Sequence, residues 1–139
     1  MFLDWIKQHG GFVSVDFKKD IFYSVDDRKI FDSLPQDLKD GILKNAEQYL
    51  GCDWQTVKAT DWMAFNRTGD RLAQENKFFK NRQKLNCLAL AECVENKGRF
   101  LDDIINGLYS ACEESFWGLS AHMGTNYTAK YLPLTVPIK

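Results

Sequence analysis

Two amphipathic patterns joined by a very short connection constrain the fold of this chain more than any other feature. The first runs from about Glu75 to Asn96 in a background of strong helix formers, and Gly98 closes it. The second runs from Arg99 to Phe116. Its apolar stripe consists of Phe100, Leu101, Ile104, Ile105, Leu108, Tyr109 and Cys112. Because only a Lys-Gly-Arg connection joins them, the sequence predicts two antiparallel helices that pack through this stripe as a hairpin.

Further helical patterns precede the hairpin. Apolar residues recur at helical spacing from Pro35 to Leu50, and Gly51 fits a left-handed cap. Asp53 fits the cap of another helix, which is followed by a polar turn over residues 67 to 71. We therefore expect an all-α fold of helical hairpins over residues 35 to 139, preceded by a poorly defined segment, residues 1 to 34, with short helices.

Composition excludes several classes of protein. The chain has 139 residues, of which 45% are hydrophobic, which is enough for the core of one domain. Eighteen basic and nineteen acidic residues give a formal charge of -1, without the basic excess that binding to nucleic acid requires. No run approaches the ~18 apolar residues of a membrane span. We expect neither a nucleic-acid nor a membrane partner.

The N-terminal sequence MFLDWIKQHG places polar residues where a signal peptide would need an unbroken apolar stretch. We therefore expect no signal peptide in this chain, and a cytoplasmic location if Met1 is the native start. The four cysteines are Cys52, Cys87, Cys93 and Cys112. They lack C-x-x-C spacing and three fall on predicted apolar helix faces, which favours buried free thiols, although an oxidised pair stays open until their positions are known.

Motifs for cofactor or metal chemistry are missing from the sequence. It contains no P-loop, no Rossmann glycine fingerprint, no nucleophile elbow and no zinc-ligand spacing. We expect no cofactor and no metal. After Phe116, small residues and two prolines predict a loop of about twenty residues, and loops of that length in a helical domain are functional or disordered.

The segment from Arg82 to His122 carries the most specific pattern. It reads RQKLNCLALAECVENKGRFLDDIINGLYSACEESFWGLSAH, and Leu132-Pro133 follows. An arginine before a leucine-rich helix, an R-F-L-D-D-I-I-N-G-L helix, C-E-E-x-x-W and A-H resemble the amino-terminal helical domain of the heparinase II/III-like family. The resemblance covers residues 54 to 134. This chain departs from it at Ser120, where the family has proline, and at Leu72-Ala73-Gln74, where a tyrosine-glutamate pair is expected.

The resemblance implies a fold and an activity. The fold is an incomplete (α/α) toroid, a ring of helical hairpins whose cleft binds an anionic polysaccharide, followed in the full protein by a β-sandwich. Family members cleave uronic-acid-containing chains by β-elimination with a tyrosine and an asparagine-histidine pair, which would lie beyond Lys139. On this reading the chain is an amino-terminal fragment of a polysaccharide lyase that holds no catalytic residue and is inactive alone.

Two other functions stay open. One is a non-catalytic helical module that binds a protein or a carbohydrate, because helical hairpins also build such surfaces. The other is part of a different (α/α) toroid enzyme, such as an unsaturated uronyl hydrolase, which would need paired acids.

Four residues are candidates for substrate binding: His122, Trp117, Tyr127 and Arg71. They could hold a uronate carboxylate or stack on a sugar ring. Each also has a structural interpretation: His122 in loop structure, Trp117 as a core aromatic that closes the hairpin, and Arg71 in a bridge between helices. The expected partner is an anionic, uronate-containing polysaccharide.

Neighbouring charged residues have structural interpretations too. Glu113 and Glu114 are adjacent on a helix and cannot act together as an acid and base pair, so one of them is expected to brace the following loop. Arg82 is expected to bridge helices. An incomplete toroid would expose an apolar edge, through which the chain could self-associate.

Overall fold

The computed structural model describes residues 28 to 123, and this part of the chain contains five α-helices, one 3-10 turn and no strand. The prediction of an all-α fold is confirmed. The helices are α3 (Arg28–Asp32), α4 (Gln36–Glu47), α5 (Ala59–Thr68), α6 (Leu72–Glu95) and α7 (Leu101–Cys112), and the 3-10 turn is η1 (Ser120–His122). The chain divides into two compact units, residues 1 to 33 with α3 and residues 34 to 139 with the other elements.

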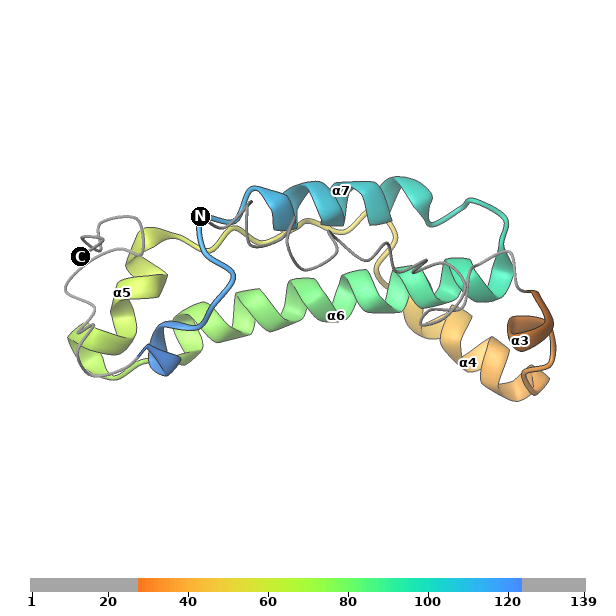
Figure 1. The fold of residues 1–139 in the computed structure, drawn as a ribbon, viewed down its shortest axis with the longest axis horizontal. Helices are drawn as coiled ribbons and strands as arrows, with labels where there is room; N and C mark the ends of the chain where they lie inside the picture. The colour runs from red at the N-terminus through yellow and green to blue at the C-terminus, as the bar shows by residue number, and fades with distance from the viewer. Residues whose placement is uncertain (1–27, 124–139) are drawn as a thin grey trace, which may run out of the picture. The chain divides into compact units, whose positions relative to one another are not determined.

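The predicted hairpin is present, and α7 runs back beside the longest helix, α6 (Figure 1). Helix α6 begins earlier than expected, because the Asp70 carboxylate accepts hydrogen bonds from the backbone N–H groups of Leu72 and Ala73 at 3.0 and 3.2 Å. It ends at Glu95, because the next residue, Asn96, has a left-handed backbone (φ 54°) and caps the helix before the predicted Gly98 is reached.

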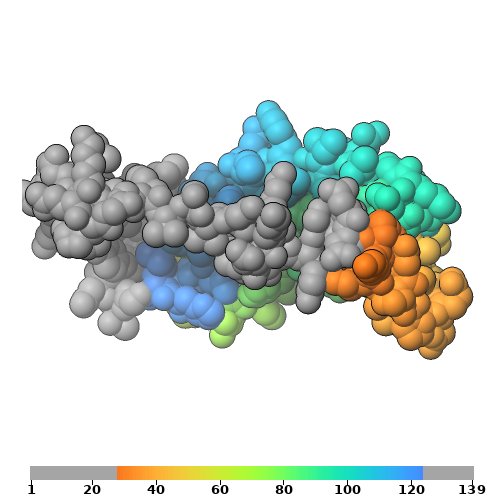
Figure 2. Space-filling model, turned by 45° about the vertical axis from the view of Figure 1, so that its right-hand side comes forward, coloured from red at the N-terminus to blue at the C-terminus, as the bar shows by residue number. Residues whose placement is uncertain are grey.

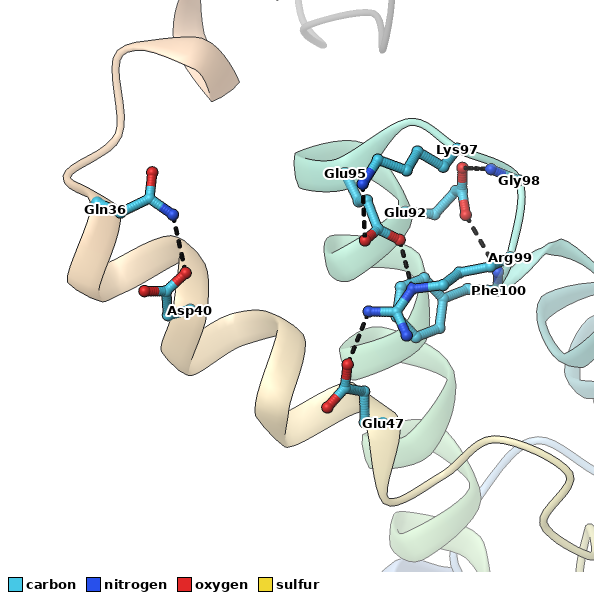
Figure 3. Close-up of polar contacts among 9 residues, drawn as sticks. All are labelled: Gln36, Asp40, Glu47, Glu92, Glu95, Lys97, Gly98, Arg99 and Phe100. Atoms are coloured by element: carbon cyan, nitrogen blue, oxygen red, sulfur yellow. Dashed lines mark hydrogen bonds and ion pairs between the residues drawn. The ribbon is translucent and has the colours of Figure 1, made fainter.

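The turn between α6 and α7 is fixed by two charged side chains (Figure 3). The Glu92 carboxylate accepts hydrogen bonds from the backbone N–H groups of Gly98, at 2.6 Å, and Phe100, at 3.2 Å. The Arg99 guanidinium donates to Glu95 and, across to α4, to Glu47 at 2.8 Å. The turn is therefore tied to both α6 and α4.

The hydrophobic core lies where α4, the C-terminal half of α6 and the start of α7 meet. Its fully buried members are Ala46, Leu88, Ala91 and Phe100. The apolar face that was predicted for residues 35 to 50, which include α4, is only partly buried. Its residues Ile42, Leu43 and Tyr49 pack against the core, whereas Leu38 and Leu50 are exposed.

The expected packing of α7 is wrong for most of its apolar stripe. Leu101, Ile105, Leu108 and Tyr109 are exposed, and only Phe100 and Ile104 contact the core. The buried residue within α7 is Gly107, and a Cβ atom there would come within 2.4 Å of the Trp54 ring. Trp54 therefore packs directly on the backbone of α7, which turns much of the apolar stripe outward.

Trp54 belongs to an extended segment, residues 52 to 58, where the sequence predicted the start of a helix capped by Asp53. Helix α5 begins only at Ala59. The side-chain amide of Asn81 accepts a hydrogen bond from the Gln55 N–H at 3.1 Å and donates one to the Gln55 carbonyl at 2.7 Å. Lys84 donates to the Asp53 carbonyl. The side chains of α6 thus satisfy backbone N–H and C=O groups of the segment that a helix would otherwise have paired with each other.

The thiols differ from the predicted buried state. Cys52, Cys87 and Cys112 are free, as expected, but Cys112 is exposed and the other two are half-buried. Among residues 28 to 123, no helix combines the length and apolar character needed to cross a membrane.

Candidate functional site

The loop after α7, residues 113 to 123, is held in place by a buried glutamine of α6. Gln74 is 1% exposed. Its side-chain amide donates to the Gly118 carbonyl at 2.9 Å and accepts from the Ser120 N–H at 2.8 Å. A buried amide without hydrogen-bond partners would destabilise the fold, so the burial of Gln74 in α6 requires the loop to keep the position in which Gly118 and Ser120 reach it.

Two further contacts fix the same loop. Arg82 of α6 makes a two-pronged ion pair with Glu114, so the bridge that was predicted between two helices joins a helix to the loop instead. The same pair identifies Glu114 as the residue that braces the loop. The partner of Glu114 is the Arg82 guanidinium. The Phe116 ring packs edge-on against Trp62 of α5, with ring centroids 4.7 Å apart.

Trp117 is exposed, so its interpretation as a core aromatic is wrong. Its side chain is 65% exposed, and its indole N–H donates to the Ala111 carbonyl at 2.8 Å. That hydrogen bond satisfies the indole N–H and restricts the ring while leaving most of its surface in solvent. An exposed aromatic ring held in this way can stack on a ligand.

His122 and Arg71 lie next to each other, although 51 residues separate them in the sequence. The Arg71 guanidinium and His122 Nε2 are 3.4 Å apart, and both side chains are accessible. Arg71 also pairs with Glu75 at 2.8 Å, one turn along α6, and this hydrogen bond raises the pKa of Arg71. The carboxylate partly offsets the charge that Arg71 could offer to an anionic ligand. Arg71, which precedes the first residue of α6, therefore contacts both Glu75 on that helix and His122 in the 3-10 turn η1, and not a second α-helix as expected.

The fourth candidate, Tyr127, lies outside the described residues. Two of the other three, His122 and Arg71, are neighbours. Trp117 is carried by the same loop as His122.

A pocket of about 350 Å³ lies beside this loop. Its walls are the extended segment from residue 55 to 58, Trp62 of α5, Gln74 of α6, one face of α7 and residues 114 to 116 of the loop. We refer to it as the α5–α7 pocket. None of His122, Trp117 and Arg71 lines it, whereas Glu113 and Glu114 do.

One face of α7 gives the pocket a polar wall. Asn106 and Ser110 are four residues apart, as are Tyr109 and Glu113, the residue that caps the end of α7, so these two pairs lie side by side toward one side of the helix. Asn106 and Ser110 were not among the residues predicted from the sequence to form a site, although their four-residue spacing indicates a polar stripe on one side of the helix. Gln74 was noticed only as a departure from the family pattern.

Charged side chains surround Asp61 near the N-terminal end of α5, and one of them, Lys58, lines the pocket. Partial burial acts to raise the pKa of Asp61, but a hydrogen bond from Lys77, another from the Lys58 backbone and both lysine charges outweigh it and lower the pKa. Lys77 Nζ is 2.6 Å from the carboxylate. In the part of the chain that the structure describes, no group of three or more His, Cys, Asp and Glu side chains could hold a metal ion.

No family model matches this chain, and no curated protein is significantly similar to it. The resemblance to the heparinase II/III-like family therefore rests on the motifs in the sequence. The geometry adds that the segment carrying C-E-E-x-x-W and A-H forms a braced loop with an exposed tryptophan and histidine.

Proposed function

We propose that this chain contributes to the carbohydrate-binding helical region of a polysaccharide lyase that cleaves uronic-acid-containing polysaccharide by β-elimination. The observation that carries the proposal is the braced loop, which Gln74 and Arg82 hold from beneath while the Trp117 ring and His122 stay accessible. Buried polar contacts that orient exposed groups are typical of a binding surface. The resemblance over residues 54 to 134 supports the choice of polysaccharide as ligand.

The chemistry of the exposed groups suits a uronate. A tryptophan face is apolar and can cover the C–H groups of a sugar ring. Guanidinium and imidazole groups donate hydrogen bonds to a carboxylate, and Arg71 and His122 supply one of each. The residues that would carry out β-elimination are implied by the resemblance to lie beyond Lys139, so this chain by itself is expected to bind without turnover.

The two alternatives are supported to different degrees. The exposed apolar side of α7 supports a non-catalytic helical module that binds another protein. A glycoside hydrolase of the unsaturated uronyl type would need two carboxyl groups in acid and base roles. Glu114 is paired with Arg82, so this region gives that alternative less support than the other two.

The test is a calorimetric titration, in which uronate oligosaccharides from glycosaminoglycans and alginate are added to the 139-residue chain and the affinity is measured. Trp117→Ala should lower the affinity about tenfold, which corresponds to ~1.4 kcal/mol, because it removes the stacking surface. Phe79→Ala removes another exposed aromatic ring, on α6, and should leave the affinity unchanged. Both variants should keep the melting temperature of the parent to within a few degrees.

Two results would contradict the proposal. One is the absence of binding to every uronate oligosaccharide tested. The other is an equal loss of affinity in Trp117→Ala and Phe79→Ala, which would show a non-specific effect. In a longer protein that contains this chain, formation of the unsaturated uronate product, followed by its absorbance, would separate a lyase from a non-catalytic module.

A further inference from the structure

We propose that the α5–α7 pocket binds an uncharged, hydroxyl-rich sugar ring, as a subsite separate from the uronate-binding surface at Trp117, His122 and Arg71. The nature of this ligand rests on the proposed function, whereas the pocket itself is defined by other residues. Its volume of about 350 Å³ falls within the range of small-molecule sites, roughly 300 to 1,000 Å³.

Aromatic rings line part of the pocket. Trp62 and Phe116 form a T-shaped pair there, and Tyr109 contributes a third ring, which is largely exposed. Trp62 is buried and Phe116 is half-buried, so these two rings form apolar wall, whereas the exposed Tyr109 ring can cover the C–H face of a sugar and its hydroxyl can form a hydrogen bond.

The polar wall is not used by the fold. Within residues 28 to 123, the side chains of Asn106, Ser110 and Glu113 have no hydrogen-bond or ion-pair partner, yet all three line the pocket from one face of α7. Asn106 and Ser110 can each donate and accept, and the Glu113 carboxylate accepts only. Sugar hydroxyls both donate and accept, so neighbouring hydroxyls on one ring match this set.

The charges at the pocket favour a neutral ligand over an anionic one. Glu114 is already compensated by Arg82, and the cation Lys58 is attracted by the carboxylate of Asp61. That leaves Glu113 as a carboxylate without a cationic partner among the described residues. A uronate carboxylate placed beside it would be repelled, since like charges at close range disfavour binding. Uronate and neutral rings should therefore bind at different places.

The experiment uses the ¹⁵N-labelled 139-residue chain and two probes: methyl N-acetylglucosaminide, which is neutral, and methyl glucuronide, which is anionic. The neutral sugar should shift the amide resonances of residues 55 to 58 and 106 to 113. Glu113→Gln should weaken its binding at least about fivefold because it removes a charged acceptor, which is among the stronger hydrogen-bonding groups. Asp102→Asn removes an exposed carboxylate from the same helix and should bind as the parent does.

Ser110→Phe provides a second variant, which fills the pocket with a ring and should abolish the shifts caused by the neutral sugar. The inference is overturned if Glu113→Gln and Asp102→Asn bind the sugar equally. It is also overturned if the glucuronide binds more tightly in the pocket than the neutral sugar.

The two proposals can fail separately. If uronate oligosaccharides bind in a Trp117-dependent manner while the neutral sugar leaves the pocket resonances unchanged, the inference fails and the proposed function stands. If the neutral sugar binds with dependence on Glu113 and no uronate binds, the pocket is a sugar site and the proposed function fails.

Discussion

Gly107 and Trp54 set the position of α7 at the scale of single residues. The Trp54 ring lies so close to α7 that a Cβ atom on Gly107 would come within 2.4 Å of it. Glycine is an unfavourable residue inside a helix, and its presence here follows from close packing and not from helix propensity. The same contact holds the extended segment of residues 52 to 58, which forms one wall of the α5–α7 pocket.

Gly107→Ala should therefore destabilise the protein by about 1 to 3 kcal/mol, because overpacking against Trp54 outweighs the gain in helix propensity. Gly41→Ala provides a matched control within α4, where a Cβ atom meets nothing within 4 Å. It should stabilise the protein by about 0.5 to 1 kcal/mol. Urea unfolding measures both values. Stabilisation by Gly107→Ala would contradict the packing described here.

At the scale of elements, the two halves of helix α6 make different kinds of contact. Its C-terminal half contributes the apolar residues Leu88 and Ala91 to the core. Its N-terminal half buries polar side chains, of which Gln74 holds the loop after α7 and Asn81 holds the extended segment. A further polar contact, between Lys77 and Asp61, joins α6 to α5. The site is therefore assembled by hydrogen bonds and ion pairs more than by apolar packing.

The contact between Lys77 and Asp61 predicts a pH dependence. The pKa of Asp61 is lower in the folded state than its ordinary value of 3.8. The resulting stabilisation is thus present above pH 3.8 and is lost as the pH falls through the lower, folded-state value. Asp61→Asn should reduce the free energy of unfolding at neutral pH by up to about 1 kcal/mol. It should also make that free energy fall less steeply as the pH drops below 3.8.

Lys77→Met should flatten the same part of the curve, because it removes the side-chain hydrogen bond that holds the carboxylate in its charged form. Chemical unfolding measured at a series of acidic pH values gives the curves. An unchanged acid profile in both variants would show that the ion pair does not contribute.

The outer surface of α7 is the main apolar feature at the scale of the molecule. In Figure 2 the part of the chain that includes α7 forms the upper edge of the surface, in teal to light blue. Leu101, Ile105 and Leu108 are between 46% and 59% exposed, and their four- and three-residue spacing places them on one side of the helix. Tyr109, which is 68% exposed, lies at the border between this side and the pocket wall. Contiguous exposed apolar surface is typical of sites that contact another element or chain.

We propose that this surface makes the 139-residue chain self-associate and bind a hydrophobic dye. Replacing both Ile105 and Leu108 by glutamine should lower dye fluorescence and shift the chain toward a monomer in analytical ultracentrifugation. Leu72→Gln changes an exposed leucine at the start of α6 and should have little effect on either measurement. A parent chain that stays monomeric at high concentration and binds no dye would refute this expectation.

The sequence by itself determined where most of the helices lie. Helical spacing and caps are local properties, so the hairpin, the helix before Gly51 and the all-α class followed from residues a few positions apart. It also placed Trp117 and His122 in a loop after the second long helix and identified Arg82 as a bridge. What it could not give was the side of each helix that is buried.

Only the tertiary structure decided that side. Whether the apolar stripe of α7 faces inward depends on Trp54, which reaches Gly107 from 53 positions earlier in the chain. The brace from Gln74 to Ser120 spans 46 positions, and the ion pair from Arg82 to Glu114 spans 32. A buried polar residue has the same local pattern as an exposed one until its distant partner is known. For this reason the loop after α7 could be predicted from the sequence, whereas the pocket beside it could not.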